Sequence, residues 1–189
     1  MTKNEFLRRF QLKPLLQSQH KYQHPSATRN AAVLIPLFES KGKLQVVLTK
    51  RAMHLKHHAG QISFPGGKVE PEDETIIDTA LREAEEEIGL SPEYVSIIGQ
   101  MPVYQTITGF SVIPVVAVIP DYISFSIDEN EVAEIFNVPL RHFLDTNNQH
   151  SIEVQHKGRS HHVNFMPYKN YHIWGATASM LKDLAIHLN

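Results

Sequence analysis

Four glutamates lie close together in the segment ALREAEEEIGL, residues 80–90, at positions 83, 85, 86 and 87. Like charges spaced this closely on a helix repel each other and lower the stability of the helix. Carboxylates that converge on one point are the ligands that hard divalent cations such as Mg²⁺ use, often together with water and substrate phosphates. A bound metal ion would offset the repulsion, so this segment is the first candidate for chemistry.

The residues around these glutamates predict a helix over 75–88 that divides them into two groups. With Glu83 placed at 0° and about 100° per residue, Glu87 falls at about 40° and Glu86 at about 300°, so three carboxylates share one face. Glu85 points away from them. A separate apolar stripe, able to pack on a sheet, is formed by Ile77, Ala80, Leu81, Ala84 and Ile88. Spacing alone leaves a solvated acidic face as the alternative to a metal site.

The segment before this helix, FPGGKVEPEDET (64–75), adds features that suit a phosphate ligand. It contains a Gly-Gly pair, an acidic loop with a proline, and Thr75 as the expected N-cap. Glycines allow close approach of the backbone to a ligand, including a phosphate. Such a pair alone is typical of a turn, but beside the glutamates it predicts a loop and helix that hold a metal–diphosphate complex between them.

Length and composition limit the classes of protein that this chain can be. Its 189 residues fit one domain with a sizeable core, and a net charge of −2 gives no sign of a surface for nucleic acid. The absence of cysteine excludes disulfides, a thiol nucleophile and thiolate metal ligands. The first ten residues do not form a signal peptide, and no apolar run has the ~20 residues of a membrane helix. We therefore expect a cytoplasmic protein, whose oligomeric state the sequence leaves open.

Further elements follow from the pattern of apolar residues and turns. Strands are expected at 31–38, 44–51, 94–99, 110–119 and near 151–156, and a second helix at 174–188. The polar stretch 17–30 is typical of a linker, so we expect an N-terminal extension at 1–29 and one domain at 30–189. Strands mixed with two substantial helices predict a layered α/β domain with a partly antiparallel sheet.

Residues 67–90 resemble the Nudix box, whose pattern is Gly, five residues, Glu, seven residues, then Arg-Glu-apolar-x-Glu-Glu-x-Gly-apolar. Positions 82–90 match the second half completely, and Glu74 stands seven residues before Arg82. In the first half, six residues rather than five separate Gly67 from Glu74, and Lys68 stands at the glycine position. A motif of this kind is a hypothesis that its structural context must test.

The resemblance implies a Nudix fold, an α/β/α sandwich around a mixed sheet, and hydrolysis of a diphosphate linked to another moiety. It implies that Glu83, Glu86 and Glu87 hold Mg²⁺ or Mn²⁺, and that Arg82 orients them by ion pairing. The segment 128–140 resembles a later part of the family that often brings a further glutamate to the metals. Glu131 is the first choice for that catalytic role and Glu134 the second, and a surface carboxylate is the alternative for each.

A second resemblance concerns the substrate. Residues 47–67 are similar to the motif of the coenzyme A pyrophosphatase branch, with Lys56 at a position where arginine is expected, and IWGATASML (173–181) also resembles that branch. This implies cleavage of coenzyme A to 4′-phosphopantetheine and adenosine 3′,5′-bisphosphate. The 3′-phosphate of coenzyme A would suit one of three basic residues, Lys50 among them. The substrate-binding residues expected from this motif are Arg51, Lys56, Gly60, Phe64, Gly66 and Gly67.

Two other functions remain open at this point. One is a Nudix hydrolase that acts on another nucleoside diphosphate derivative, such as ADP-ribose, a dinucleotide, a nucleotide sugar or a nucleoside triphosphate. The other is a non-catalytic Nudix module that binds a nucleotide or a protein. Degenerate glutamates would be typical of the second, whereas here Glu83, Glu86 and Glu87 are all present with Arg82.

Overall fold

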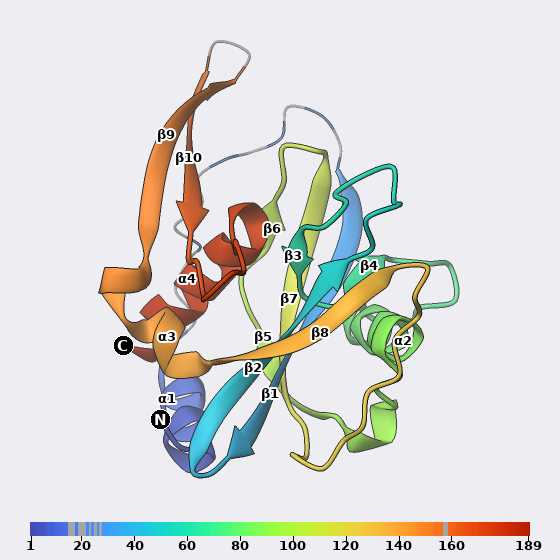
Figure 1. Ribbon diagram of the computed structural model, residues 1–189, viewed down its shortest axis with the longest axis vertical. Helices are drawn as coiled ribbons and strands as arrows, with labels where there is room; N and C mark the ends of the chain where they lie inside the picture. The colour runs from blue at the N-terminus through green and yellow to red at the C-terminus, as the bar shows by residue number, and fades with distance from the viewer. Residues whose placement is uncertain (15–17, 19–21, 23, 25, 27, 157–158) are drawn as a thin grey trace.

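A mixed β-sheet forms the centre of the computed structural model, which describes residues 1–14, 18, 22, 24, 26, 28–156 and 159–189 (Figure 1). Its main path runs β3-β2-β1-β7-β5, while β4, β6 and β8 pair with β1, β7 and β2 respectively. The strands are β1 (Arg29–Ser40), β2 (Lys43–Arg51), β3 (Ile62–Ser63), β4 (Gly66–Lys68), β5 (Ser96–Gln100), β6 (Tyr104–Gln105), β7 (Phe110–Val118) and β8 (Val132–Pro139). The strands expected from the sequence at 31–38, 44–51, 94–99 and 110–119 are all present.

The hairpin of β1 and β2 opens along its length. Near the turn the two strands pair with each other, from Leu37 opposite Val46 to Ser40 opposite Lys43. Farther from the turn, β1 pairs instead with β4, and the end of β2 pairs with β3. β1 also runs parallel to β7, which makes the sheet mixed. Because β3 and β4 enter where the hairpin opens, β4 lies in contact with the helix that carries the glutamates.

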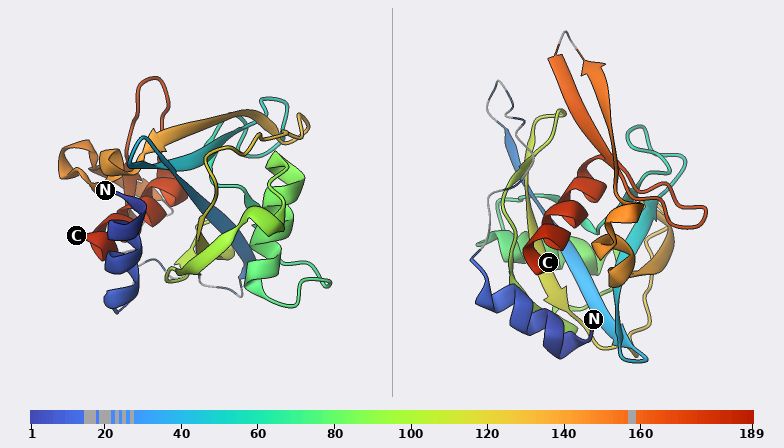
Figure 2. Two further views of the ribbon diagram at one scale, coloured as in Figure 1. Left: turned by 90° about the horizontal axis from the view of Figure 1, so that it is seen from below. Right: turned by 90° about the vertical axis from the view of Figure 1, so that its left-hand side faces the viewer.

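Two hydrophobic clusters lie on opposite faces of this sheet. On one face, α2 (Ile76–Ile88) packs Ala80, Ala84 and Ile88 against β1 and β7. The cluster on the other face contains residues of α1 (Lys3–Leu12), of α3 (Leu140–Leu144) and of α4 (Gly175–Leu188). Figure 2 shows the sheet between these two groups of helices. Strands that alternate in side-chain direction need apolar cover on both faces. Helices supply this cover on each face of the sheet, and the predicted α/β/α sandwich is confirmed.

The N-terminal helix α1 packs on α4. Phe6 is fully buried, and the ring of Phe10 meets that of His187 edge to face at 4.8 Å between centroids. His187 Nε2 lies 2.9 Å from the carbonyl oxygen of Phe10, and Arg9 donates a hydrogen bond to the carbonyl oxygen of Leu188. Much of the linker expected at 17–30 lies outside the described residues, so the division at residue 29 stays a prediction.

One strand of the main sheet was not expected from the sequence, whereas the strand expected near 151–156 is present. The strand β8 pairs with β2 along seven residue pairs, although Glu134 and Asn137 interrupt its apolar pattern. The hairpin of β9 (His150–His156) and β10 (Arg159–Phe165) projects from the body of the molecule as a separate two-stranded sheet (Figure 1). The short 3₁₀ turns are Pro92–Tyr94 and Thr146–Asn148. Within the described chain, no helix is long and apolar enough to cross a membrane.

We expect Phe6→Ala to lower the free energy of unfolding by about 3–5 kcal/mol, because it leaves a cavity under α1. Leu12→Ala is the matched control, since Leu12 belongs to the same helix and is 76% exposed. Chemical denaturation of both variants measures the difference. Equal, small effects of the two changes would mean that α1 does not belong to the folded core.

Candidate active site

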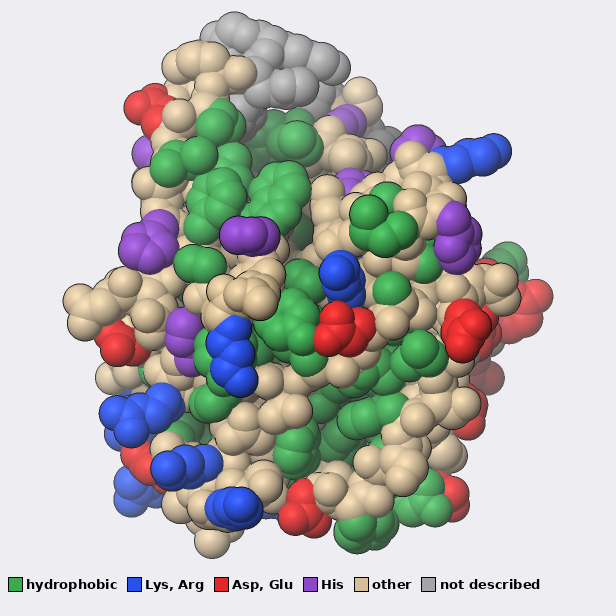
Figure 3. Space-filling view, viewed as in Figure 1, with side chains coloured by type: hydrophobic (Ala, Val, Ile, Leu, Met, Phe, Trp, Pro, Cys, Tyr) green, Lys and Arg blue, Asp and Glu red, His purple; other side chains and the backbone are tan. Residues whose placement is uncertain are grey.

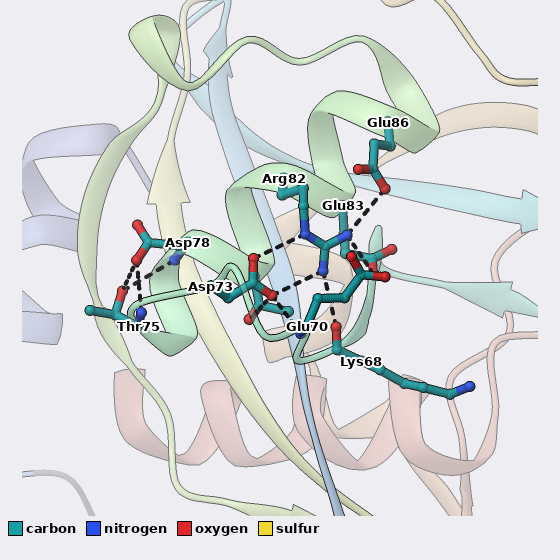
Figure 4. A network of polar contacts seen from close by, with 9 residues as sticks. Lys68, Glu70, Asp73, Thr75, Asp78, Arg82, Glu83 and Glu86 are labelled. Atoms are coloured by element: carbon teal, nitrogen blue, oxygen red, sulfur yellow. Dashed lines mark hydrogen bonds and ion pairs between the residues drawn. The ribbon is translucent and has the colours of Figure 1, made fainter.

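The helix that carries the glutamates has well-defined ends. The Thr75 hydroxyl accepts a hydrogen bond from the Asp78 amide, and the Asp78 carboxylate accepts one from the Thr75 amide, which forms a capping box (Figure 4). At the other end, the Gly89 amide donates to carbonyl oxygens of the last turn. These ends set the phase of the helix, and so decide which of its side chains face the loop that precedes it.

The three glutamates predicted to act together differ in exposure. Glu87 is 3% exposed, the Glu83 side chain 15% and the Glu86 side chain 59%. Glu85 is exposed, and the sequence places it away from the other three. One guanidinium nitrogen, Nη1 of Arg82, lies 3.1 Å from both Glu83 Oε1 and Glu86 Oε2. The helix therefore presents a row of carboxylates that runs from a buried to an exposed position.

Arg82 is anchored by Asp73, which lies in the loop before α2. Its Nε and Nη2 each donate to one oxygen of Asp73 at 3.0 Å, and Nη2 also donates to the Lys68 carbonyl oxygen (Figure 4). Asp73 accepts further hydrogen bonds from the Thr79 hydroxyl and the Glu70 amide. The hydrogen bonds from Arg82 hold the pKa of Asp73 well below its usual range.

The sequence analysis matched Glu74 to the motif's glutamate by its spacing from Arg82, but Glu74 is exposed, and Asp73 is the residue that pairs with Arg82. A signal for it was present in the sequence. Counting forward from Gly67, the motif's five intervening residues are 68–72, and Asp73 follows them. The spacing of the glycine half is therefore kept, and the extra residue lies between Asp73 and Arg82. An aspartate, shorter than glutamate by one methylene group, is the partner that this loop brings to Arg82.

The two glycines before this loop are needed for packing around the site. A Cβ at Gly67 would collide with the carboxylate of Glu83, and a Cβ at Gly66 would collide with the backbone of β1 at Ala32 and Val33. The role of Gly67 in the structure is thus to leave room for a carboxylate. Substrate contact by either glycine stays a prediction.

Arg51, at the end of β2, connects the buried end of the carboxylate row with a second loop. Its Nη1 lies 3.6 Å from Glu87 Oε1, and its Nη2 lies 3.8 Å from Glu131 Oε2. The Glu131 carbonyl oxygen accepts a hydrogen bond from the Ala52 amide, which ties the loop to the end of β2. Glu134, the second choice, accepts a hydrogen bond from the Tyr171 hydroxyl instead. Of the two candidates, the structure brings Glu131 to the site.

Glu87 is the most perturbed carboxyl group of the site. Burial raises its pKa to about 8, opposed by Arg51 and reinforced by the nearby charges of Glu131 and Glu83. Its Oε2 has no hydrogen-bond partner among the described residues. Burial also raises the pKa of Glu83, although Arg82 opposes that shift. A buried, unpartnered carboxylate oxygen beside other carboxylates is where a cation would be stabilising.

The residues of this site fit a hard divalent cation by their chemistry. They offer carboxylate oxygens alone, which suits Mg²⁺ and Mn²⁺ better than softer metals. In the described part of the chain, no three His, Asp or Glu side chains are already arranged as a set of metal ligands. In the present arrangement, Arg82 and Arg51 compensate the negative charge that a metal ion would otherwise neutralise.

The remaining residues predicted to bind substrate are dispersed. Lys56 is exposed in the loop between β2 and β3, and Gly60 lies at the end of the same loop in a left-handed conformation beside the Met53 side chain. Phe64 is 2% exposed and belongs to the hydrophobic cluster on the α4 side of the sheet. The structure gives Phe64 a packing role, and its contact with substrate stays a prediction.

A family model described as the NUDIX domain matches residues 28–169. The chain belongs to the Nudix hydrolase family. Relatives called uncharacterized Nudix hydrolase NudL, from Salmonella newport (strain SL254) and Enterobacter sp. (strain 638), are 41% and 40% identical to it over 188 residues. Each alignment covers 100% of this chain and 95% of the relative. The protein is therefore a Nudix pyrophosphohydrolase, a class of enzyme that uses divalent metal ions.

Solved structures agree with the fold. The Nudix hydrolase RenU from M. smegmatis is 21% identical, with a TM-score of 0.53 over 69% of this chain and 81% of that chain. A binary complex of the C. elegans Ap4A hydrolase is 20% identical, with a TM-score of 0.51 over 60% of this chain and 81% of that chain. At this level of identity the likeness is one of fold, and it confirms the predicted Nudix fold.

Substituting Asp73 and Glu74 separately tests which residue anchors Arg82 in this Nudix box. We expect Asp73→Asn to lower the free energy of unfolding by about 1–3 kcal/mol, because a charge-assisted pair is lost. Glu74→Gln, one residue away and exposed, is expected to change it by less than about 0.5 kcal/mol. Urea denaturation compares the two, and a larger effect at Glu74 would show that Glu74 rather than Asp73 stabilises this loop.

The raised pKa of Glu87 predicts a pH-dependent loss of stability when metal is removed. Between its ordinary value of 4.5 and about 8, Glu87 is ionised in the unfolded chain but protonated in the fold. The free energy of unfolding therefore falls as pH rises through this window, by at most about 1.4 kcal/mol per pH unit. We expect Glu87→Gln to remove this fall.

The free energy of unfolding of wild type and of Glu87→Gln is measured by denaturation in a chelator at a series of pH values. The effect is the difference between the two proteins at each pH. Glu85→Gln is the control, since Glu85 is exposed and lies on the same helix. A difference curve that is flat between pH 5 and 8 would show that Glu87 is already ionised in the metal-free fold.

Proposed function

We propose that this Nudix hydrolase cleaves the diphosphate bond of coenzyme A or its derivatives, giving 4′-phosphopantetheine and adenosine 3′,5′-bisphosphate. One observation carries the proposal. The segment that resembles the coenzyme A motif, residues 47–67, is the segment that borders the carboxylate row. Its Arg51 contacts Glu87, and its Gly67 leaves the space that Glu83 fills.

In the proposed mechanism, Glu83, Glu86 and Glu87 hold a divalent cation, Mg²⁺ or Mn²⁺. When bound there, the metal supplies charge neutralisation for the diphosphate and activates water for attack on phosphorus. Arg82 keeps Glu83 and Glu86 on one side of the helix through its contacts with both. Its ion pair with Asp73, at 3.0 Å, holds the guanidinium in that position.

Glu131 is the proposed general base. Its side chain is 49% exposed and carries an oxygen 3.8 Å from Arg51, so it is open to solvent and close to the buried end of the row. A base must be within reach of the proton that it takes, directly or through one water, and no other carboxylate outside α2 is paired with Arg51 among the described residues. Arg51 would then hold the base and the ligand Glu87 at a fixed separation.

The testing experiment is a comparison of substrates. Coenzyme A, ADP-ribose and a nucleoside triphosphate are incubated with Mg²⁺ or Mn²⁺, and products are identified by mass. We expect coenzyme A to be cleaved best, and Glu86→Gln to lower kcat about 100-fold or more, since changes even to the partners of metal ligands cost 10–100-fold. Glu85→Gln is the matched control on the exposed side of the same helix.

Each of the other outcomes would indicate a different function for this protein. Equal or better cleavage of ADP-ribose or the triphosphate would leave the metal site in place and refute coenzyme A as the substrate. Tight nucleotide binding with no metal-dependent hydrolysis of any diphosphate would refute the catalytic assignment altogether.

A further inference from the structure

A pocket of about 400 Å³ lies between the ends of β2 and β3 and the segment that joins β10 to α4. Its walls include Lys50 and Gln61 on one side and Asn170, Tyr171 and Trp174 on the other. Figure 3 shows a hollow in this region beside hydrophobic side chains at the base of the β9–β10 hairpin. None of the residues in the carboxylate row lines this pocket.

The pocket and the carboxylate row lie on opposite faces of β2 at the same end of the strand. Leu48 packs in the cluster on the α4 side, whereas Val47 packs in the cluster on the α2 side. Since successive side chains of a strand point to opposite faces, Lys50 points to the α4 side and Arg51 to the α2 side. Arg51 accordingly contacts Glu87 of α2, while Lys50 lines the pocket.

Two aromatic side chains make one wall of the pocket. The ring of Tyr171 stacks on Phe136 with 3.7 Å between centroids and 3° between planes, and its hydroxyl donates to Glu134. Trp174 is 41% exposed, and its ring stacks on Phe165 at 6.2 Å and 14°. Each of the two rings is thus supported on one face by another aromatic ring. Aromatic surfaces of this kind bind nucleobases by stacking, with little dependence on which base is present.

The opposite wall carries a positive charge. Lys50 forms no ion pair within 4 Å in the described part of the chain, whereas Arg51 is paired with Glu87 and Glu131. Lys56, the third basic residue of this region, is exposed and does not line the pocket. The amides of Gln61 and Asn170 add donors and acceptors suited to the edge of a base. Aromatic wall, amides and cation together match a nucleoside that bears a phosphate monoester.

We propose that this pocket binds the nucleoside 3′-phosphate end of the substrate, with the base against Tyr171 and Trp174 and the 3′-phosphate at Lys50. The diphosphate lies at the carboxylate row, and the substrate curves around the end of β2, where Lys50 and Arg51 are neighbours. The assignment rests on the proposed function, because it takes a 3′-phosphorylated nucleotide as the substrate. It makes Lys50 the residue that separates coenzyme A from nucleotides without a 3′-phosphate.

The test measures binding of two nucleotides by calorimetry in the presence of a chelator, which removes the metal site from the comparison. The probes are adenosine 3′,5′-bisphosphate and adenosine 5′-monophosphate. We expect wild type to bind the bisphosphate about tenfold more tightly, as a charge-assisted contact allows. Lys50→Gln should abolish that preference and leave the monophosphate affinity unchanged.

The aromatic wall is tested with the same two probes. Trp174→Ala should weaken both nucleotides roughly tenfold, and Trp174→Phe should restore most of the loss because it keeps a ring. Lys43→Gln, an exposed lysine at the start of β2, and Tyr122→Ala, an aromatic residue that is 74% exposed, are the matched controls and should bind as wild type does. Thermal unfolding of each variant checks that the fold is kept.

The outcomes separate this proposal from the proposed function. Wild-type affinity in both Lys50→Gln and Trp174→Ala would overturn the pocket assignment even if coenzyme A is hydrolysed, and so would the failure of wild type to bind either probe. Loss of the bisphosphate preference in Lys50→Gln, in a protein that does not cleave coenzyme A, would leave the pocket assignment standing and refute the proposed function.

Discussion

The guanidinium group of Arg82 makes the contacts on which the arrangement of the site depends. This one guanidinium contacts the carboxylate of Asp73, in the loop before α2, and those of Glu83 and Glu86, on one face of α2. A planar group with several donors can satisfy that many acceptors at once, which an ammonium group cannot. The same contact fastens the loop to α2 through the Lys68 carbonyl oxygen. Without it, the helix would carry uncompensated repulsion and the loop would lose its anchor.

The opening of the β1–β2 hairpin is the structural condition for this contact. It admits β3 and β4, and thereby brings the Gly-Gly segment against α2, where Gly67 accommodates the Glu83 carboxylate. It also sends the end of β2 towards α2, where Arg51 meets Glu87. Two arginines thus approach one row of carboxylates from different elements. The burial of Glu87 costs stability in the metal-free fold, which is typical of a site arranged for a ligand.

The sequence by itself determined the parts of this protein that depend on neighbouring residues. The helix over 75–88 and the separation of Glu85 from the other glutamates follow from a period of about 3.6 residues. The Thr75 cap follows from the preference of this position for threonine and similar residues. The strands β1, β2, β5 and β7 follow from apolar runs between turns. The resemblance of 67–90 to the Nudix box was sufficient to predict the fold and the class of enzyme, and both are confirmed.

Only the tertiary structure decided which distant residues meet. Asp73 rather than Glu74 anchors Arg82 because the path of the seven-residue loop between β4 and α2, not its composition, brings this carboxylate to the guanidinium. Phe64 lies in the core and Glu131 reaches Arg51 for the same reason. The strand β8 forms because β2 offers it an edge, although its own pattern is weak. Local periodicity depends on residues that are adjacent in the sequence, whereas these contacts depend on how separate elements pack against one another.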